Sequence, residues 1–376
     1  MKIKTNTMKN IFLACKAILA LALAANCVQG YADSRIVETP ASDSRICYTG
    51  RTVAEDGNVS FDWTGTDCRI RFSGPYLAVR CSDTKANYFN VWIDKEFSDK
   101  ADKVIRTSGQ DTLIVIAENL GRGEHTAIIQ KRTEGEQGTV TFHSFSTKGE
   151  IINSRATQGR FIEFIGDSNT CGFGVESNVA TDPFTPETEN CNLSYAAIAS
   201  RYFNADFALI AHSGQGVARN YDGDMKDITM LERYDRAMDM DANHEWGQED
   251  ISRIPDIVVI FLGSNDFSTG KQPRMQVFVE RYLELVGKVR RNYGEDIPIL
   301  CIASRTDPLL HSYISEACAR DGRLSLCTMH EKSYSNVSDL GASYHPNRIG
   351  QRKIASIVIP YISSITGWEM PVEPYL

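Results

Sequence analysis

The sequence predicts an α/β protein in which an all-β sandwich or jelly roll precedes a three-layer α/β/α domain on a parallel sheet. The chain has 376 residues, about twice the size of a typical single domain. Residues 33–152 alternate apolar and polar side chains with period two, whereas residues 153–376 alternate apolar runs with helical periodicity. A content of 42% hydrophobic and 23% charged residues is enough for a core in each part.

Residues 1–32 are typical of a secretory signal peptide. Three lysines precede the apolar run from Ala17 to Ala25, and small residues follow at Gly30 and Ala32. The run is too short to span a bilayer. We therefore expect a secreted or periplasmic protein, and Cys27 offers the alternative of a lipid-anchored lipoprotein.

The charge of the chain excludes some partners. The formal net charge is −8, and it becomes −12 when the four lysines of the leader are removed. An acidic protein lacks the basic footprint that nucleic acid requires. No long apolar run follows the leader, so we expect neither a nucleic-acid partner nor a membrane span.

Short strands separated by turns dominate residues 33–152. In the run Tyr88–Asp94, the side chains of Phe89, Val91 and Ile93 share one face, as in a half-buried strand. Turn-rich pieces such as Ser73-Gly74-Pro75 separate such runs. Many short strands at this spacing predict a sandwich or jelly roll.

Residues 153–376 have the sequence pattern that is typical of a parallel sheet covered by helices. Near-continuous apolar strands alternate with amphipathic segments in the order Phe161–Ile165, Leu193–Phe203, Phe207–Ala211, Ile257–Leu262, Met275–Tyr293 and Ile297–Ala303. On such sheets, ligands bind beyond the carboxyl ends of the strands.

The cysteines permit disulfides but predict no metal site. Eight cysteines remain after the leader, and an even number in an oxidising compartment is compatible with disulfides. We favour the pairs Cys171–Cys191 and Cys318–Cys327, with scattered buried thiols as the alternative. No cysteine or histidine cluster has zinc-ligand spacing, so we expect neither a metal nor another cofactor.

Ser168 is the candidate nucleophile. The strand Phe161–Ile165 leads directly into Gly166-Asp167-Ser168, which places the serine hydroxyl at the carboxyl edge of the predicted sheet. A serine hydroxyl is a weak nucleophile unless a base takes its proton. The alternative is that Ser168 only caps the following helix.

Two other strand ends offer donors for an oxyanion. The strand ending at Ala211 leads into a glycine turn that contains Gly214, and the strand ending at Leu262 leads to Asn265. The backbone N–H of Gly214, the side-chain amide of Asn265 and the backbone N–H of Ser168 form one set of hydrogen-bond donors. Ordinary turn geometry is the alternative for both loops.

His345 is the candidate base. It precedes Pro346, which suits the first turn of a C-terminal helix, so the imidazole is expected on a loop at the sheet edge. His212 lies close to the glycine turn and is a weaker rival. The other histidines lack such a context.

These four blocks, in this order, resemble the SGNH (GDSL-type) hydrolase superfamily. A preceding jelly-roll-like part with Tyr48-Thr49-Gly50-Arg51, Phe61-Asp62-Trp63-Thr64-Gly65 and Asn87-Tyr88-Phe89-Asn90-Val91 resembles carbohydrate esterase family 2. Members of that family remove O-acetyl groups from plant cell-wall polysaccharides without a metal. The resemblance implies an acetyl xylan esterase-like enzyme that acts on acetylated xylan, glucomannan or derived oligosaccharides.

The resemblance also implies the roles of four residues. Ser168 is the nucleophile, His345 is the base, and Gly214 and Asn265 donate to the oxyanion together with the N–H of Ser168. An acyl-enzyme forms on the serine and water then hydrolyses it.

One position departs from the superfamily pattern. The Asp that usually stands two or three residues before the histidine is replaced by Ser343 and Ala342. A backbone carbonyl, or a distant acid such as Asp339 or Glu331, is then expected to orient His345 in a Ser–His dyad. The alternatives are a catalytically weak or inactive carbohydrate-binding protein, or a lipase or thioesterase of the same superfamily.

Three aromatic residues are candidates for contacts with a sugar. Tyr221 and Trp246 are the substrate-binding residues that we single out, and Trp368 is a further candidate. Ordinary packing in the core is the alternative for each of them.

Overall fold

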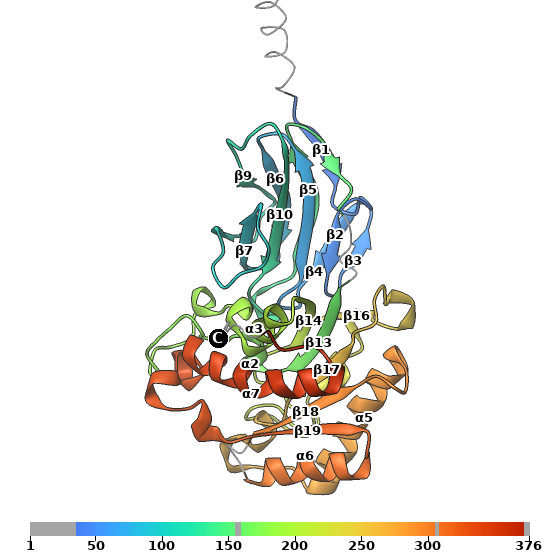
Figure 1. Cartoon of the computed structure of the whole chain (residues 1–376), viewed down its shortest axis with the longest axis vertical. Helices are drawn as coiled ribbons and strands as arrows, with labels where there is room; N and C mark the ends of the chain where they lie inside the picture. The colour runs from blue at the N-terminus through green and yellow to red at the C-terminus, as the bar shows by residue number, and fades with distance from the viewer. Residues whose placement is uncertain (1–34, 155–158, 305–307, 372–376) are drawn as a thin grey trace, which may run out of the picture.

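A computed structural model of the chain describes residues 35–154, 159–304 and 308–371, without the side chain of Glu331. A β domain stands on an α/β domain, and the chain passes between them after β12 (Ile151–Ile152) and before β13 (Arg160–Gly166) (Figure 1). The predicted boundary at residues 152 and 153 lies at the end of β12. The predicted signal peptide, with Cys27, lies outside the described residues.

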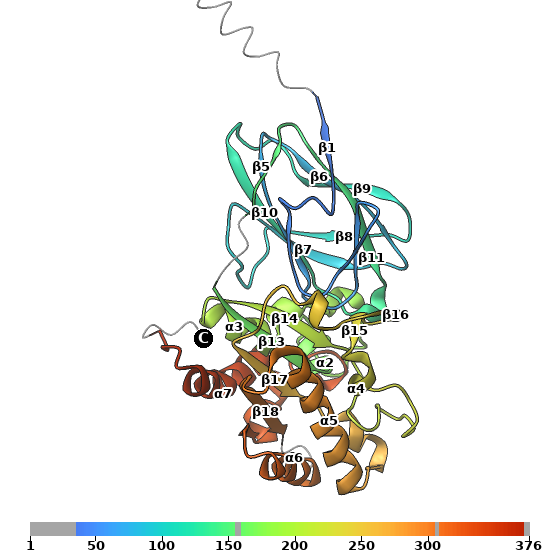
Figure 2. The ribbon, with the colours of Figure 1, turned by 90° about the vertical axis from the view of Figure 1, so that its right-hand side faces the viewer.

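The β domain consists of two antiparallel six-stranded sheets (Figure 2). The first has the order β3-β4-β11-β6-β9 with β1 beside β11, and its strands are β1 Val37–Pro40, β3 Val53–Glu55, β4 Asn58–Phe61, β6 Leu77–Asp83, β9 Thr112–Ala117 and β11 Val140–Thr147. The second has the order β12-β5-β10-β7-β8 with β2 beside β5, and its strands besides β12 are β2 Cys47–Thr49, β5 Asp67–Ser73, β7 Tyr88–Ile93, β8 Lys103–Arg106 and β10 Glu124–Lys131.

Aromatic side chains join the two sheets. Phe61 and Phe142 from the first sheet contact Phe89 from the second, with ring centroids 6.2 and 5.8 Å apart. These rings lie in one buried cluster that draws apolar residues from both sheets. The alternate side chains of each strand point into the core that the two sheets share, which explains the period-two alternation. The predicted all-β domain is confirmed.

The α/β domain is built on a five-stranded parallel sheet in the order β14-β13-β17-β18-β19. The strands that follow β13 are β14 Ala205–Ala211, β17 Ile257–Phe261, β18 Ile299–Ser304 and β19 Leu324–Met329. The chain first leaves β13 toward β14 and later returns on its other side to β17, so the order reverses at β13. Such a switch point is where open α/β sheets bind ligands.

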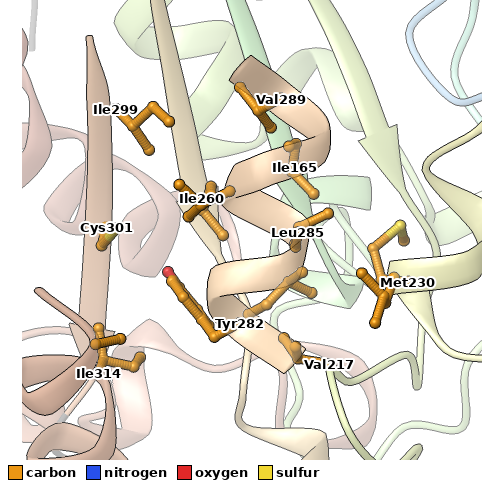
Figure 3. Packing of buried hydrophobic residues seen from close by; sticks show 14 of the residues in the cluster. Ile165, Val217, Met230, Ile260, Tyr282, Leu285, Val289, Ile299, Cys301 and Ile314 are labelled. Carbon is orange, nitrogen blue, oxygen red and sulfur yellow. The ribbon is translucent and has the colours of Figure 1, made fainter. Parts of the chain in front are cut away.

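Helices cover both faces of this sheet. One face carries α4 (Met230–Arg233), α5 (Met275–Tyr293) and α6 (Pro308–Arg320), and the other carries α3 (Tyr195–Tyr202) and α7 (Arg348–Thr366). Tyr282, Leu285 and Val289 of α5 face Ile260 of β17 and Ile299 of β18 (Figure 3). The predicted three-layer arrangement is therefore confirmed.

Several elements differ from the sequence-based expectations. The strand β19, the helix α6 and a hairpin of β15 (Arg236–Met238) and β16 (Asp241–Glu245) were not among the predicted segments. Pro346 does not enter the C-terminal helix: α7 begins at Arg348, and Asn347 caps it by accepting the N–H groups of Ile349 and Gly350 at 2.8 and 3.2 Å. An Asn side chain at this position satisfies two orphan donors, which proline does not.

The expected disulfides are wrong for this structure. All eight cysteines of the described residues are free. Cys318 packs on the α5 and α6 side of the sheet, whereas Cys327 lies in the cluster on the α3 and α7 side, so the sheet separates them. The Cys171 thiol faces a carboxylate and the Cys191 thiol faces the carbonyl of Lys131, 3.4 Å away.

The described part of the chain contains no helix that is both long and apolar enough to cross a bilayer. Its longest helices, α5 and α7, each have 19 residues and each present one buried face to the sheet.

The packing of α5 predicts a large loss of stability in one variant. Leu285 is completely buried between the helix and the sheet, so Leu285→Ala leaves a cavity and lowers the free energy of unfolding by about 3 kcal/mol. Urea denaturation followed by circular dichroism measures this change. The exposed neighbour Glu284 provides the control, because Glu284→Ala changes stability by less than about 0.5 kcal/mol. A loss of less than about 1 kcal/mol in Leu285→Ala would contradict the packing described.

Candidate active site

Ser168 lies at the carboxyl edge of the sheet, at the first residue of α2 (Ser168–Cys171). The carboxylate of Asp167 caps this short helix by accepting the N–H of Asn169 at 3.0 Å. The turn from strand to helix is tight: a Cβ at Gly166 would lie 2.0 Å from Oγ1 of Thr170, so only glycine fits there. Ser168 therefore enters the helix and presents its hydroxyl at the switch point, so the capping role belongs to Asp167.

The imidazole of His345 contacts the Ser168 hydroxyl. Nε2 of His345 lies 2.9 Å from Oγ of Ser168, although the two residues are 177 positions apart in the sequence. Gln351 of α7 holds the two segments together: its side chain donates to the carbonyl of Asn169 at 3.0 Å and accepts the N–H of Tyr195 at 2.8 Å. The helix that follows His345 is therefore tied to the turn that carries Ser168.

A backbone carbonyl orients the imidazole. Nδ1 of His345 lies 3.0 Å from the carbonyl oxygen of Ser343 and donates to it. Ser343 and Tyr344 both adopt left-handed backbone conformations, with φ of 52° and 61°. Their N–H groups each donate, at 2.9 Å, to the carbonyls of Asp182 and Ala180. Two consecutive non-glycine residues in this region cost energy, so the surrounding hydrogen bonds hold a strained turn that aims the carbonyl at the ring.

Asp339, one of the acids expected to orient His345, binds Lys353 instead. Both carboxylate oxygens of Asp339 lie 2.8 Å from Nζ of Lys353, and one of them also accepts from Asn336. These contacts hold the pKa of Asp339 below its usual value, although burial opposes them. The side chain of Glu331 lies outside the described residues. Of the alternatives considered, the structure places the backbone carbonyl against the ring.

The surroundings of His345 favour the neutral imidazole. The ring is half-buried and packs on Phe173, with ring centroids 4.5 Å apart. Burial lowers the pKa of His345 below the ordinary value of 6.5, although the Ser343 carbonyl works in the opposite direction. A neutral ring that donates from Nδ1 has a free lone pair on Nε2, which is the form that can accept the serine proton.

His212, the alternative base, is hydrogen-bonded to Asp239. Its Nδ1 lies 2.5 Å from a carboxylate oxygen of Asp239, and the residue is buried. Burial alone would lower the pKa of His212, but Asp239 outweighs it and raises the pKa above 6.5. His212 is therefore held by Asp239, whereas His345 makes the contact with the Ser168 hydroxyl.

The two predicted oxyanion donors differ in their availability. Gly214 has a φ of +77° in the turn after β14, and within the described part of the chain no hydrogen bond engages its N–H. The side-chain nitrogen of Asn265 instead donates to the carbonyl of Gln215 at 2.8 Å and to Asp167 at 3.3 Å. Its donation to an oxyanion therefore requires that the longer contact, to Asp167, be exchanged.

The aromatic candidates lie in three different places. Tyr221 is 63% exposed, and its N–H donates to the carbonyl of Gly214 at 2.8 Å, beside the predicted oxyanion turn. Trp246 lines a separate cavity of about 460 Å³ near the start of β13, where its ring covers the guanidinium of Arg51. Trp368 is half-buried and packs against Phe203 of the core. Tyr344, which the sequence reasoning missed, is 65% exposed immediately before His345.

A serine hydroxyl in contact with an imidazole, at the switch point of a five-stranded parallel sheet, is the arrangement of a serine hydrolase. Residues 164–353 match the GDSL-like Lipase/Acylhydrolase family, and residues 48–154 match the Carbohydrate esterase 2 N-terminal family. The chain therefore belongs to the GDSL-like lipase/acylhydrolase family and has the two-domain organisation of the family 2 carbohydrate esterases, as the motifs predicted.

Two relatives are similar to most of this chain. It is 31% identical over 346 residues to Cellulase/esterase CelE of Acetivibrio thermocellus, covering 88% of this chain and 41% of CelE. The chain thus spans less than half the length of that relative. It is also 25% identical over 351 residues to an acetylxylan esterase / glucomannan deacetylase of Cellvibrio japonicus, covering 88% of this chain and 89% of the relative.

Solved structures share the fold of both domains. A family two carbohydrate esterase from Clostridium thermocellum, solved in complex with cellohexaose, is 28% identical with a TM-score of 0.78 and covers 86% of this chain and 100% of that one. A family two carbohydrate esterase from Cellvibrio japonicus has a TM-score of 0.79 at 23% identity, covering 89% of this chain and 99% of that one. The second likeness concerns the fold alone.

The opposite surroundings of the two histidines predict opposite titrations. His345 titrates below pH 6.5, because burial disfavours its imidazolium, and His212 titrates above pH 6.5, because Asp239 favours the charged ring. NMR titration of the imidazole signals measures both values, with His345→Gln and His212→Gln variants to assign them. Observing His345 with the higher pKa of the two would refute this description of the site.

Proposed function

We propose that this protein is a serine esterase that removes O-acetyl groups from plant cell-wall polysaccharides, such as acetylated xylan or glucomannan, or from oligosaccharides derived from them. The observation that carries the proposal is the 2.9 Å hydrogen bond between Oγ of Ser168 and Nε2 of His345 at the carboxyl edge of the sheet. The names of the relatives support the same substrate class, because they include acetylxylan esterase and glucomannan deacetylase.

The proposed reaction is a two-step acyl transfer through a Ser–His dyad. His345 takes the proton of Ser168 as its oxygen attacks the ester carbonyl, and the imidazolium that forms keeps its hydrogen bond to the Ser343 carbonyl. The sugar alkoxide then leaves with the proton from His345. Water, deprotonated by the same ring, attacks the acetyl-enzyme, and acetate is released as Oγ of Ser168 takes the proton back from His345.

Three donors are proposed to hold the tetrahedral oxyanion. The N–H of Ser168 is one of the orphan donors at the start of α2, and the N–H of Gly214 is open. The amide of Asn265 joins them when it exchanges its 3.3 Å contact with Asp167 for the stronger acceptor. Each such donor contributes on the order of 3 kcal/mol to the transition state.

The orientation of His345 supports an active enzyme over an inactive carbohydrate-binding protein. The missing carboxylate at positions 342 and 343 motivates the inactive alternative, but the Ser343 carbonyl satisfies Nδ1 of the ring. The exposed ring of Tyr221 beside Gly214 is proposed to support a sugar of the substrate. We further propose that the protein acts in the periplasm or outside the cell, as its predicted leader implies.

Replacement of the nucleophile tests the proposal directly. Ser168→Ala removes the attacking oxygen, so acetate release from acetylated xylan and glucomannan falls to background while the melting temperature stays close to that of the wild type. Assays with acetyl and long-chain p-nitrophenyl esters distinguish an acetylesterase from a lipase. An unchanged rate in Ser168→Ala would remove Ser168 from its role. Glycan binding without acetate release by the wild type would establish the inactive alternative.

The contribution of Asn265 is testable by truncation. Asn265→Ala removes the side-chain donor, and turnover falls by about 100-fold or more, with a smaller effect on KM, because the interaction forms only in the transition state. Steady-state kinetics with an acetylated substrate measures the loss. A decrease of less than about threefold would show that Asn265 serves only to hold Asp167 and Gln215.

A further inference from the structure

A loop of the β domain reaches the catalytic edge of the other domain. Glu134, just after β10, is 1% exposed, and its Oε2 accepts the N–H of Ser213 at 2.5 Å. Ser213 immediately precedes Gly214. The thiol of Cys171, at the end of the helix that begins with Ser168, donates to the same oxygen at 3.7 Å. One carboxylate from the β domain therefore contacts both backbone segments that carry the proposed nucleophile and oxyanion donor.

Glu134 belongs to a buried carboxyl pair. Its N–H donates to Oε2 of Glu189 at 3.3 Å, and Glu189 is completely buried. Burial and the neighbouring Glu134 raise the pKa of Glu189 well above its usual value, so Glu189 keeps a proton. Oε2 of Glu134 thus accepts from Ser213 and Cys171, while Glu189 accepts the N–H of Glu134.

The same cluster does not have the chemistry of a cation site. The ligand atoms of Glu134, Cys171 and Glu189 lie within 4.8 Å of one another. Burial raises the pKa of the Cys171 thiol well above 9, so the sulfur remains protonated and acts as a donor. Glu189 is held protonated in the same way, and Oε2 of Glu134 already accepts two hydrogen bonds.

The charge of Glu134 acts on several groups. Lys131 is buried beside it and donates to the carbonyls of Thr133 and Glu134 at 2.6 and 2.9 Å. The titratable groups that feel the Glu134 charge are Lys131, Asp167, Cys171, Glu189, His212 and His345. Burial lowers the pKa of His345, whereas Glu134 raises it. Glu134 therefore favours the imidazolium form of His345.

We propose that Glu134 of the β domain is a positioning residue of the esterase site, which holds the Ser213–Gly214 turn and stabilises the imidazolium formed on His345. The inference rests on the proposed function. The Ser343 carbonyl orients the ring but has only a partial charge. Glu134 adds a carboxyl group from the other domain, which contacts the turn that carries Gly214 and the helix that begins with Ser168.

Two variants of the full-length chain separate charge from hydrogen bonding. Glu189→Gln is the matched control, because its side-chain oxygen can still accept the N–H of Glu134 and Glu134 itself is unchanged. The double variant Glu134→Gln, Glu189→Gln keeps hydrogen-bonding side chains at both positions but removes the charge. For the double variant relative to Glu189→Gln, we expect kcat for acetate release to fall by about tenfold or more, with KM within about twofold.

The second measurement does not depend on activity. NMR titration of His345 in the same two variants measures the effect of Glu134 on the imidazole. We expect a lower pKa of His345 in the double variant, because Glu134 raises that pKa in the wild type. His125, whose partner is Asp94 in the β domain, serves as the internal reference because its titration stays unchanged. Melting temperatures verify that each variant folds. If the double variant does not fold, Glu134→Gln replaces it in both measurements.

The outcomes distinguish this inference from the proposed function. A wild-type protein that releases no acetate would refute the esterase, and the titration would still decide whether Glu134 stabilises the imidazolium. An unchanged pKa of His345 would overturn the electrostatic part of the inference, and a lower kcat would then reflect only the turn that Glu134 holds. A lower pKa of His345 together with an unchanged kcat would overturn its catalytic part.

Discussion

The site depends on the parallel arrangement of three neighbouring strands. Because β13, β14 and β17 run in the same direction, their carboxyl ends meet at one edge, and the chain reverses its order at β13. Ser168, Gly214 and Asn265 each follow one of these strands. The C-terminal helix α7, packed on the sheet, brings His345 to the same edge. A different strand order would separate these four residues.

The imidazole is held by a strained turn. Ser343 and Tyr344 adopt left-handed backbone conformations at the point where the sequence lacks a carboxylate, and hydrogen bonds to the 180–182 segment hold them there. The free energy that this conformation costs is offset by the packing of α7 and by the cap that Asn347 provides. A carbonyl in a rigid turn thus fixes the ring, whereas a flexible side chain would have to be ordered first.

The two domains share buried polar groups as well as apolar contacts. Asp62 of the β domain accepts the N–H of Asp239 at 2.7 Å, and Asp239 in turn pairs with His212. Arg69 of the β domain pairs with Asp206 of β14 at 2.7 Å. Removing one partner of such a buried network leaves an uncompensated charge, so the β domain is a structural part of the catalytic half. Glu134 extends this dependence to the reacting groups.

The sequence by itself determined the two domains, the parallel sheet, and Ser168 and His345 as a candidate pair, because local periodicity and residues at strand ends are read directly from the chain. The helix Met275–Tyr293 has the bounds that its apolar spacing predicted. Only the tertiary structure decided that a carbonyl orients His345 and that Asn265 donates to Asp167. It also decided that Trp246 lines another cavity and that the cysteines of the described residues are free. The contact of Glu134 with the turn beside Gly214 likewise appears only in the folded chain. Each of these depends on backbone direction or on contacts between segments far apart in the chain, for which sequence spacing carries no signal.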